Sequence, residues 1–332
     1  GISLLREKIC EYLNNFKNLN YQRDEIICTN GSKYAIFLIL YHLCINKNSE
    51  IIIPTPCWKA HVNSVKLVGA TPVFFETKSD NMFQLDINKL EELITKKTKA
   101  IILCNPNNPT GIIYNKQTLD GIAYIAKKYK IFVISDEVYE MFDFYNSHIS
   151  LASLEDMKNY TFTVNGFSKG FGLPGIRLGY IAAPKKHVNR IKKIQANITT
   201  CPNIISQYYG VILLENLNEY KKLGLEIEKV CNFLYNSIIK LPNIKCHYPN
   251  GSLFLFPDIS FYINKTLCGQ KIKTSTDFCE LLLQNFNIGV SPGDNFYASN
   301  HIRISYDIDM NKAIELVKRL HLVFNNSEIN LV

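Results

Sequence analysis

The residues best suited to chemistry are a lysine, an arginine and an aspartate, each close to a strand-like apolar run. Lys169 lies in a glycine-containing turn at 168–172, and Arg177 follows eight residues later. Asp136 is the second residue after the apolar run 131–134. Brought together, such groups can bond covalently to a carbonyl carbon, hold an anion and keep a proton on a nitrogen. A lysine in such a turn is by itself more often an exposed side chain, so the case depends on its companions.

Further polar residues also lie next to the ends of predicted strands or at the start of a predicted helix. Asn108 lies in a proline-rich turn at 105–111, and Tyr139 lies in the same segment as the aspartate. Ser32 and Lys33 stand where a helical pattern begins. The ends of strands and the starts of helices are where an open α/β sheet builds a ligand site, so these residues are expected to share one.

The combined set of groups matches the needs of pyridoxal 5′-phosphate (PLP). Its phosphate requires backbone N–H donors at a helix N-terminus, which Ser32 and Lys33 would supply, and Arg177 could complete the cradle with a bidentate contact. A buried carboxylate, Asp136, would keep the pyridine nitrogen protonated so that the ring accepts electrons. Lys169 would be the amine that bonds to the aldehyde.

The other candidates suit the remaining parts of the same cofactor. Asn108 and Tyr139 could hydrogen-bond the ring oxygen O3′, and Trp58, the single tryptophan, could stack on one ring face. Ordinary structural roles are open to each residue: a turn former, a helix cap, a core aromatic or, for the arginines, a surface ion pair. Their order along the chain and their positions beside predicted elements favour one shared site.

Strand-like apolar runs alternate with helical patterns through the first two thirds of the chain. This alternation predicts a mostly parallel sheet covered by helices on both faces. The predicted strands are 51–53, 73–75, 100–104, 131–135, 161–164 and 178–182, and the predicted helices include 32–44, 116–129 and 185–194.

The last third of the chain mixes helices and strands without regular alternation. Residues 223–239 could form one long helix that connects two domains. We therefore expect a large domain at 1–218 and a small α+β domain at 219–332 that includes the connecting helix. Within the small domain the predicted strands are 253–256 and 302–305, the predicted helices are 276–286 and 310–324, and the polar stretch 264–275 is predicted to be a surface loop.

Composition restricts the classes of partner. The 332 residues carry a net charge of +8, but the lysines are scattered and form no basic stripe interleaved with aromatics, so no nucleic-acid partner is expected. No apolar run is long enough to span a membrane. The ten cysteines lie mostly in apolar runs without a C-x-x-C pair, which favours reduced thiols in a cytoplasmic protein. No metal site is expected.

Over essentially its whole length the chain resembles the class I aminotransferases of PLP fold type I, and among them the bacterial-type aspartate aminotransferase group. The resemblance rests on a G-x-x-x-L-R-E segment at 1–7, N-P-N-N-P-T-G at 105–111, S-D-E-V-Y-E at 135–140, S-K-x(7)-R-x-G-Y at 168–180 and R-I-S-Y at 303–306. It implies an α/β fold: a large PLP domain, with a mostly parallel, mixed seven-stranded sheet covered by helices, and a smaller α+β C-terminal domain.

The family's site residues carry over to matching positions, and PLP is the implied cofactor. Lys169 resembles the Schiff-base lysine, which also acts as general base, and Asp136 resembles the partner of the ring nitrogen. Arg303 resembles the arginine that clamps the substrate α-carboxylate. The other cofactor positions are Asn108 and Tyr139 at O3′, Ser32, Lys33, Ser168 and Arg177 around the phosphate, and Trp58 against the ring.

Substrate contacts are expected from Arg303, Lys33, Trp58 and Asn108. Lys33 resembles the lysine that contacts the distal carboxylate in the bacterial aspartate group, and a tryptophan plate is typical of members that use aspartate. The resemblance thus implies a ping-pong transfer between aspartate or glutamate and a 2-oxo acid. Two alternatives stay open: another fold type I PLP enzyme (an alanine, aromatic or kynurenine aminotransferase or a C–S β-lyase), or a catalytically silent regulator that retains the fold.

The resemblance also implies a homodimer, because active sites in this family are completed across a two-fold interface. Family members carry several dozen residues before the position that matches Gly1. An N-terminal arm is therefore expected to be missing from the chain, which leaves import into an organelle open. The expected partners are amino acids and 2-oxo acids, without nucleic acid or membrane.

Overall fold

The computed structural model describes residues 1–45 and 48–325. Its central element is a seven-stranded sheet in the order β1-β7-β6-β5-β4-β2-β3. Strands β6, β5, β4, β2 and β3 are parallel, whereas β7 runs antiparallel to both β6 and β1. The expected mostly parallel, mixed sheet is therefore confirmed. Its strands are β1 (Ile26–Thr29), β2 (Glu50–Thr55), β3 (Thr71–Glu76), β4 (Thr98–Cys104), β5 (Phe132–Asp136), β6 (Thr161–Gly166) and β7 (Gly179–Ala182).

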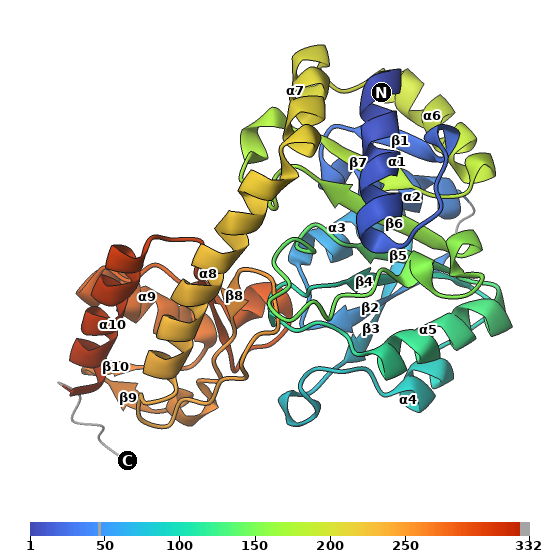
Figure 1. Ribbon diagram of the computed structural model, residues 1–332. Coiled ribbons are helices and arrows are strands. Elements are labelled where there is room, and N and C mark those ends of the chain that lie inside the picture. The colour runs from blue at the N-terminus through green and yellow to red at the C-terminus, as the bar shows by residue number, and fades with distance from the viewer. Residues whose placement is uncertain (46–47, 326–332) are drawn as a thin grey trace.

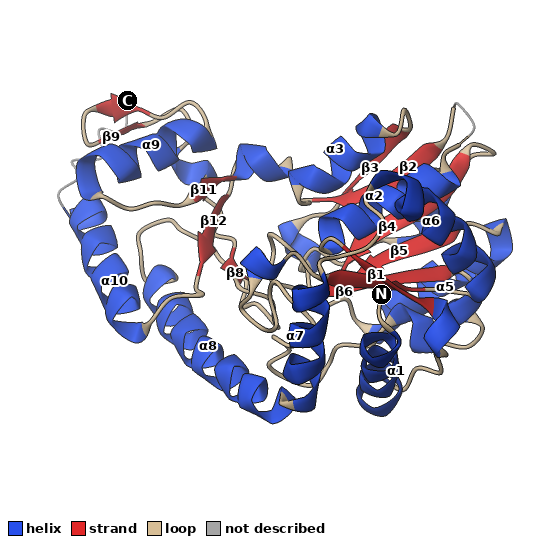
Figure 2. Cartoon of the chain, turned by 90° about the horizontal axis from the view of Figure 1, so that it is seen from above, coloured by secondary structure: helices blue, strands red, loops and turns tan. Residues whose placement is uncertain are grey.

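Helices cover both faces of this sheet (Figure 1, Figure 2). Side chains such as Ile102 and Ile134 are buried under α2, α3 and α6, while their strand neighbours Ile101 and Val133 are buried on the opposite face under α5. This division follows from the strand geometry, in which successive side chains point to opposite faces. The helices are α1 (Ser3–Lys17), α2 (Ser32–Leu43), α3 (Lys59–Leu67), α4 (Ile87–Glu92), α5 (Lys116–Tyr129), α6 (Lys185–Ile198) and α7 (Ile204–Glu215).

The long helix α8 (Leu217–Ile238) runs from the seven-stranded part to a smaller part that contains α9 and α10 (Figure 1). A three-stranded antiparallel sheet in the order β11-β12-β8 and a two-stranded hairpin, β9–β10, complete the smaller part. Its elements are β8 (Phe254–Leu255), β9 (Thr266–Leu267), β10 (Gln270–Lys271), α9 (Ser275–Phe286), β11 (Ser291–Pro292), β12 (Ile302–Ser305) and α10 (Met310–Asn325).

Two sequence-based expectations need correction. The strand β1 was not predicted, although its four residues are all buried. The stretch 264–275 was predicted to be a surface loop, but it contains the β9–β10 hairpin. Leu267 and Ile272 are fully buried there, so the hairpin contributes to the core of the smaller part.

The sheet brings the carboxyl ends of β1, β2, β4, β5 and β6 to one edge, because these strands run in the same direction. The turns that follow these strands carry most of the candidate site residues. An open α/β sheet binds ligands at this edge. Within the described part of the chain, no helix is both long and apolar enough to cross a membrane.

Candidate active site

A cavity of about 350 Å³ lies at the carboxyl edge of the sheet and is bounded on its far side by the smaller part of the molecule. All ten residues predicted for the site line this one cavity. They are Ser32, Lys33, Trp58, Asn108, Asp136, Tyr139, Ser168, Lys169, Arg177 and Arg303. The lining also includes His61 and Asp307, which the sequence did not single out.

One end of the cavity has the character of an anion site. Gly31 precedes the first turn of α2 with a φ of 86°, and a Cβ there would lie 2.5 Å from Nη2 of Arg177. Glycine therefore lets the guanidinium lie against the start of the helix. A Cβ on Gly179 would lie 2.7 Å from the backbone nitrogen of Ser32, so β7 also passes close to this turn. Free N–H groups at a helix start beside a guanidinium suit a phosphate.

The carboxylate of Asp136 lies at the end of β5 and is almost completely buried. Its Oδ2 lies 2.9 Å from Nε2 of His61. Its Oδ1 is buried without a hydrogen-bond partner among residues 1–45 and 48–325. Buried acceptors are rarely left unpaired, so this oxygen suits an N–H donor from a bound ligand. A protonated pyridine nitrogen is such a donor.

His61 is the most important site residue that the sequence reading missed. It lies in the first turn of α3, three residues after Trp58, and the two rings pack edge to face with their centroids 5.5 Å apart. The signal was the W-x-x-H spacing, because residues three apart on a helix share a face. Its partner Asp136 is 75 positions away, which no local pattern reveals.

Asn108 connects two of the predicted binding groups. Its Nδ2 donates to the hydroxyl of Tyr139 at 3.3 Å, and its Oδ1 accepts from Nη1 of Arg303 at 2.9 Å. The guanidinium carbon of Arg303 lies 4.3 Å from the ring centroid of Phe254 and 4.6 Å from that of Phe296. The arginine is therefore fixed between two aromatic rings. Burial raises the pKa of the Tyr139 phenol well above its usual value, so the hydroxyl stays protonated as a donor.

Lys169 lies in the turn after β6, with Nζ 5.7 Å from the ring centroid of Tyr139. Burial lowers the pKa of this amine. The carboxylate of Asp307 opposes that effect, and the charge of Arg303 adds to it. A lowered pKa increases the fraction of neutral amine, which is the form that attacks a carbonyl carbon.

Lys33 and Trp58 both line the cavity and contact each other. The ammonium of Lys33 lies 4.9 Å from the centroid of the indole ring, within cation–π range. Asp307, four residues after Arg303, also lines the cavity. Asp307 lies two residues after the end of β12, and its spacing of four from Arg303 was the available signal for this acidic residue.

The donor set as a whole fits PLP. Arg177 lies against the start of α2, Asp136 has an unpaired buried carboxylate oxygen, Asn108 and Tyr139 are joined by a hydrogen bond, and the pKa of the Lys169 amine is lowered. The roles of the individual residues stay predictions that the geometry accommodates.

Comparison with known proteins places this site in a family. The family model described as aminotransferase class I and II matches residues 1–320. An aspartate aminotransferase of Bacillus subtilis (strain 168) is 30% identical over 325 residues, which cover 96% of this chain and 81% of the relative.

Solved structures agree with the family model. The aromatic aminotransferase from Pyrococcus horikoshii OT3 superposes with a TM-score of 0.91 at 32% identity, covering 98% of this chain and 86% of that one. An aspartate aminotransferase from Thermus thermophilus, solved with maleate, gives a TM-score of 0.90 at 27% identity, covering 97% and 82%. The chain therefore belongs to the class I and II aminotransferases and is a PLP-dependent transaminase.

Proposed function

We propose that this transaminase uses aspartate or glutamate as amino donor and a 2-oxo acid as acceptor, in a ping-pong cycle. The observation that carries the proposal is that Lys33 and Arg303 line one cavity beside Trp58, in addition to Lys169 and Arg177, which are assigned to the cofactor. Lys33 and Arg303 could each bind one carboxylate of a dicarboxylic substrate. The names of the Bacillus relative, an aspartate aminotransferase, and of the Thermus structure, which holds the dicarboxylate maleate, support the same substrate class.

The proposed chemistry divides between the cofactor and the protein. Bound PLP supplies an electron sink for the negative charge that develops at the substrate Cα. We assign to Lys169 the amine that holds the cofactor and that, once released, moves the Cα proton. Asp136 keeps a proton on the ring nitrogen, and Asn108 and Tyr139 hydrogen-bond the ring oxygen.

The same proposal gives the remaining predicted residues binding roles. Arg303 orients the α-carboxylate, which it can do precisely because two aromatic rings and Asn108 fix the guanidinium. Trp58 covers one face of the cofactor ring. Ser32, Lys33, Ser168 and Arg177 surround the phosphate, with Lys33 also available to the distal carboxylate.

The test is an absorption spectrum of the PLP-loaded protein before and after adding L-aspartate. We expect the visible band to disappear with aspartate or glutamate, and the Lys169→Ala variant to lose both the band and turnover. Loss of the band with alanine or an aromatic amino acid, but not with aspartate, would replace the proposed substrate. Turnover by Lys169→Ala would remove the lysine from its assigned role.

Lys33→Gln separates the substrate proposal from the enzyme class. We expect KM for aspartate to rise about tenfold, because one charged contact to the substrate is lost, while KM for a monocarboxylic donor changes little. Lys59→Gln is the matched control, since Lys59 is an exposed lysine next to Trp58 that does not line the cavity. An equal change in KM for both donors would mean that Lys33 does not bind the distal carboxylate.

We further propose a domain boundary between residues 218 and 219, with a large domain at 1–218 and a small one at 219–332. Helix α8 begins at Leu217, and its side chains from Ile227 to Ile238 pack into the core of the C-terminal part.

We also propose a cytoplasmic location. No disulfide joins the cysteines of the described chain, as is usual in a reducing compartment. The bacterial and archaeal relatives lend no support to import into an organelle, so that expectation is not borne out.

A homodimer is the proposed assembly. Helix α7 packs on α1 with one face and exposes an apolar stripe on another. Ile205, Tyr208 and Ile212 on this stripe are 76%, 55% and 53% exposed. An apolar stripe of this kind on a helix favours an interface with a second chain.

A further inference from the structure

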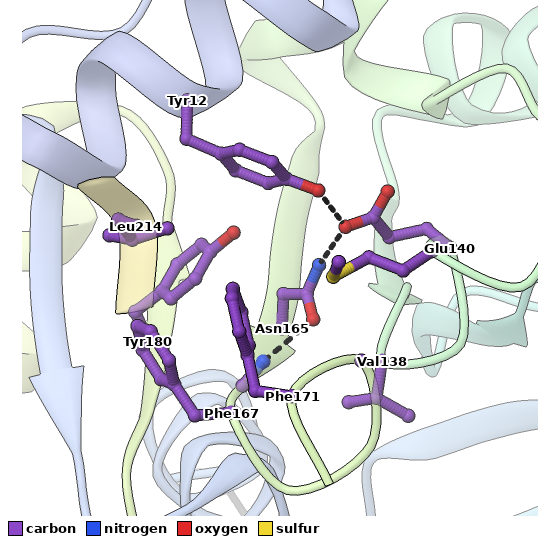
Figure 3. A pocket seen from close by; sticks show the side chains of 11 residues that line it. Tyr12, Val138, Glu140, Asn165, Phe167, Phe171, Tyr180 and Leu214 are labelled. Atoms are coloured by element: carbon purple, nitrogen blue, oxygen red, sulfur yellow. Dashed lines mark hydrogen bonds between the residues drawn. The ribbon is translucent and has the colours of Figure 1, made fainter. Parts of the chain in front are cut away.

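A buried polar cluster centred on Glu140 lies between helix α1 and strand β6 (Figure 3). At its centre the carboxylate of Glu140 accepts hydrogen bonds from the hydroxyl of Tyr12 and, at 3.2 Å, from Nδ2 of Asn165. Its second oxygen pairs with the ammonium of Lys17. We call these four residues the Glu140 cluster. It joins the turn after β5 to helix α1 and to the end of strand β6.

The Glu140 cluster is attached to both segments that carry the cofactor candidates. Asp136 and Tyr139 line the cavity, whereas Glu140, one residue later, lines a separate small space. Val138 lines both spaces and so forms part of the wall between them. In the segment 136–140, Asp136 and Tyr139 therefore face the cavity, while Glu140 is held by contacts outside the cavity.

The second segment is the turn that carries Lys169. Oδ1 of Asn165 accepts from the backbone N–H of Gly166 at 2.7 Å, three residues before Lys169. The turn also lies against Met141, the residue that follows the first segment, because a Cβ on Gly170 would lie 2.3 Å from the Met141 sulfur. A shift of the Glu140 carboxylate would therefore be transmitted to both segments.

Burial and charge strengthen the contacts within the Glu140 cluster. Burial raises the pKa of Glu140, but the Lys17 ammonium outweighs it and holds that pKa below its usual value. The carboxylate is therefore ionised, and its hydrogen bonds are of the strong, charge-assisted kind. The side chain of Glu140 is only 3% exposed, so its charge depends for compensation on Lys17, which is 17% exposed.

We propose that Glu140 is a positioning residue of the transaminase. Through Tyr12, Lys17 and Asn165 it holds the turn bearing Asp136 and Tyr139 in register with the turn bearing Lys169. This inference rests on the proposed cofactor roles of those three residues. It concerns the arrangement of the binding groups before PLP binds, so a measurement of PLP affinity tests it without turnover.

The test compares Glu140→Gln and Tyr12→Phe with wild type. The dissociation constant of PLP is measured by titrating cofactor-free protein, and the circular dichroism of bound PLP is recorded in the visible range. We expect Glu140→Gln to weaken PLP binding about tenfold and to change the dichroic band, because small misplacements of binding groups are costly. Tyr12→Phe, which removes one donor and leaves the charge pair, should weaken binding about threefold.

Glu25→Gln is the matched control. Glu25 forms a partly buried pair with Lys158, at 14% and 32% exposure, outside the cavity. The Glu25→Gln variant should have lower thermal stability than wild type, with unchanged PLP affinity and an unchanged dichroic band. All measurements are made below the melting temperature of each variant.

The outcomes separate the inference from the proposed function. If Glu140→Gln folds, loses stability as Glu25→Gln does, and binds PLP as wild type does, Glu140 has no positioning role. If Glu140→Gln does not fold, Tyr12→Phe decides, and wild-type affinity with an unchanged dichroic band would overturn the inference. If wild type itself fails to bind PLP through Lys169, the proposed function fails instead.

Discussion

Nε2 of His61 lies 2.9 Å from Oδ2 of Asp136, and the two side chains are only 2% and 4% exposed. The imidazole thus fixes the orientation of a carboxylate whose other oxygen has no partner in the described chain. A free carboxylate oxygen held in one direction is what a protonated ring nitrogen needs. The contact links the first turn of α3, which also carries Trp58, to the end of β5.

Replacing His61 should weaken cofactor binding. We expect His61→Leu to raise the PLP dissociation constant about tenfold and to cost about 1–3 kcal/mol of unfolding free energy, since the buried Asp136 oxygen loses its partner. PLP titration and urea unfolding measure the two effects. His61→Gln, whose amide can reach the same oxygen, should recover part of the affinity.

His42→Leu is the control for that experiment. His42 is also buried and forms a ring-nitrogen contact of 2.9 Å with His187, but it does not line the cavity. It should cost stability and leave PLP affinity unchanged. Equal losses of affinity in the His42 and His61 variants would show that the effect is a general loss of packing.

The stability of the protein should fall as pH rises through neutrality because of Glu137. Burial raises the pKa of this carboxyl to about 7, although the hydroxyls of Ser135 and Ser150 donate to it. The folded pKa thus exceeds the ordinary value of 4.5, so the stabilisation is fully present below that value and is lost as pH rises through about 7.

Glu137→Gln keeps the neutral form at every pH and should remove this dependence. We expect the unfolding free energy of the variant, relative to that of wild type, to be about 1–3 kcal/mol higher at about pH 8 than at about pH 5. Urea unfolding across that range measures the difference. Nε2 of His148 lies 4.0 Å from Oε2 of Glu137, but burial lowers the pKa of His148 to about 4, so the imidazole is neutral across this pH range. A constant difference between the two proteins would mean that Glu137 is ionised throughout.

The regular alternation of apolar runs was enough to predict six of the seven large-sheet strands. The exception, β1, has four residues and pairs with β7, more than 150 positions away. Its formation depends on that distant partner, since strand preference is largely a matter of packing context. The hairpin β9–β10 was not predicted for a related reason. Strands of two residues in a polar stretch show no hydrophobic period, and the hairpin is stabilised by the burial of Leu267 in the core of the smaller part.

In the candidate site, too, local motifs predicted the residues but not the long-range contacts between them. Motifs next to strand ends predicted nine of the ten residues that line the cavity, because parallel strands bring their carboxyl ends together, and the family resemblance added Arg303 from β12. The contacts that hold those residues were not visible. His61 and Asp136 are 75 positions apart, and Tyr12 and Glu140 are 128 apart. Partners this distant are set by the packing of helices on the sheet, which spacing along the chain does not encode.

Arg303→Lys should show that the shape of the arginine matters as well as its charge. The guanidinium lies between Phe254 and Phe296 and donates to Asn108, a planar arrangement that an ammonium does not reproduce. We expect KM for the amino donor to rise about tenfold or more while PLP affinity changes little. Steady-state kinetics and PLP titration measure the two. A KM like that of wild type would mean that the α-carboxylate is bound elsewhere.

The apolar stripe of α7 should be an interface between two copies of the chain. Ile205→Glu places a charge on a side chain that is 76% exposed in the single chain. If a second copy covers this stripe, the buried charge should shift the protein from dimer to monomer, since an unpaired charge in an interface costs several kcal/mol. Sedimentation velocity distinguishes the monomer of 38.1 kDa from a dimer of twice that mass.

Leu67→Glu provides the comparison for this last experiment. Leu67 is also 76% exposed, but it lies at the end of α3, away from α7. Because the same charge is added at equal exposure, a dimer that survives Leu67→Glu and dissociates with Ile205→Glu places the interface on α7. A wild-type monomer, or a dimer unaffected by Ile205→Glu, would mean that the stripe is not the interface. Loss of activity together with dimerisation would further indicate that the second copy contributes to the site.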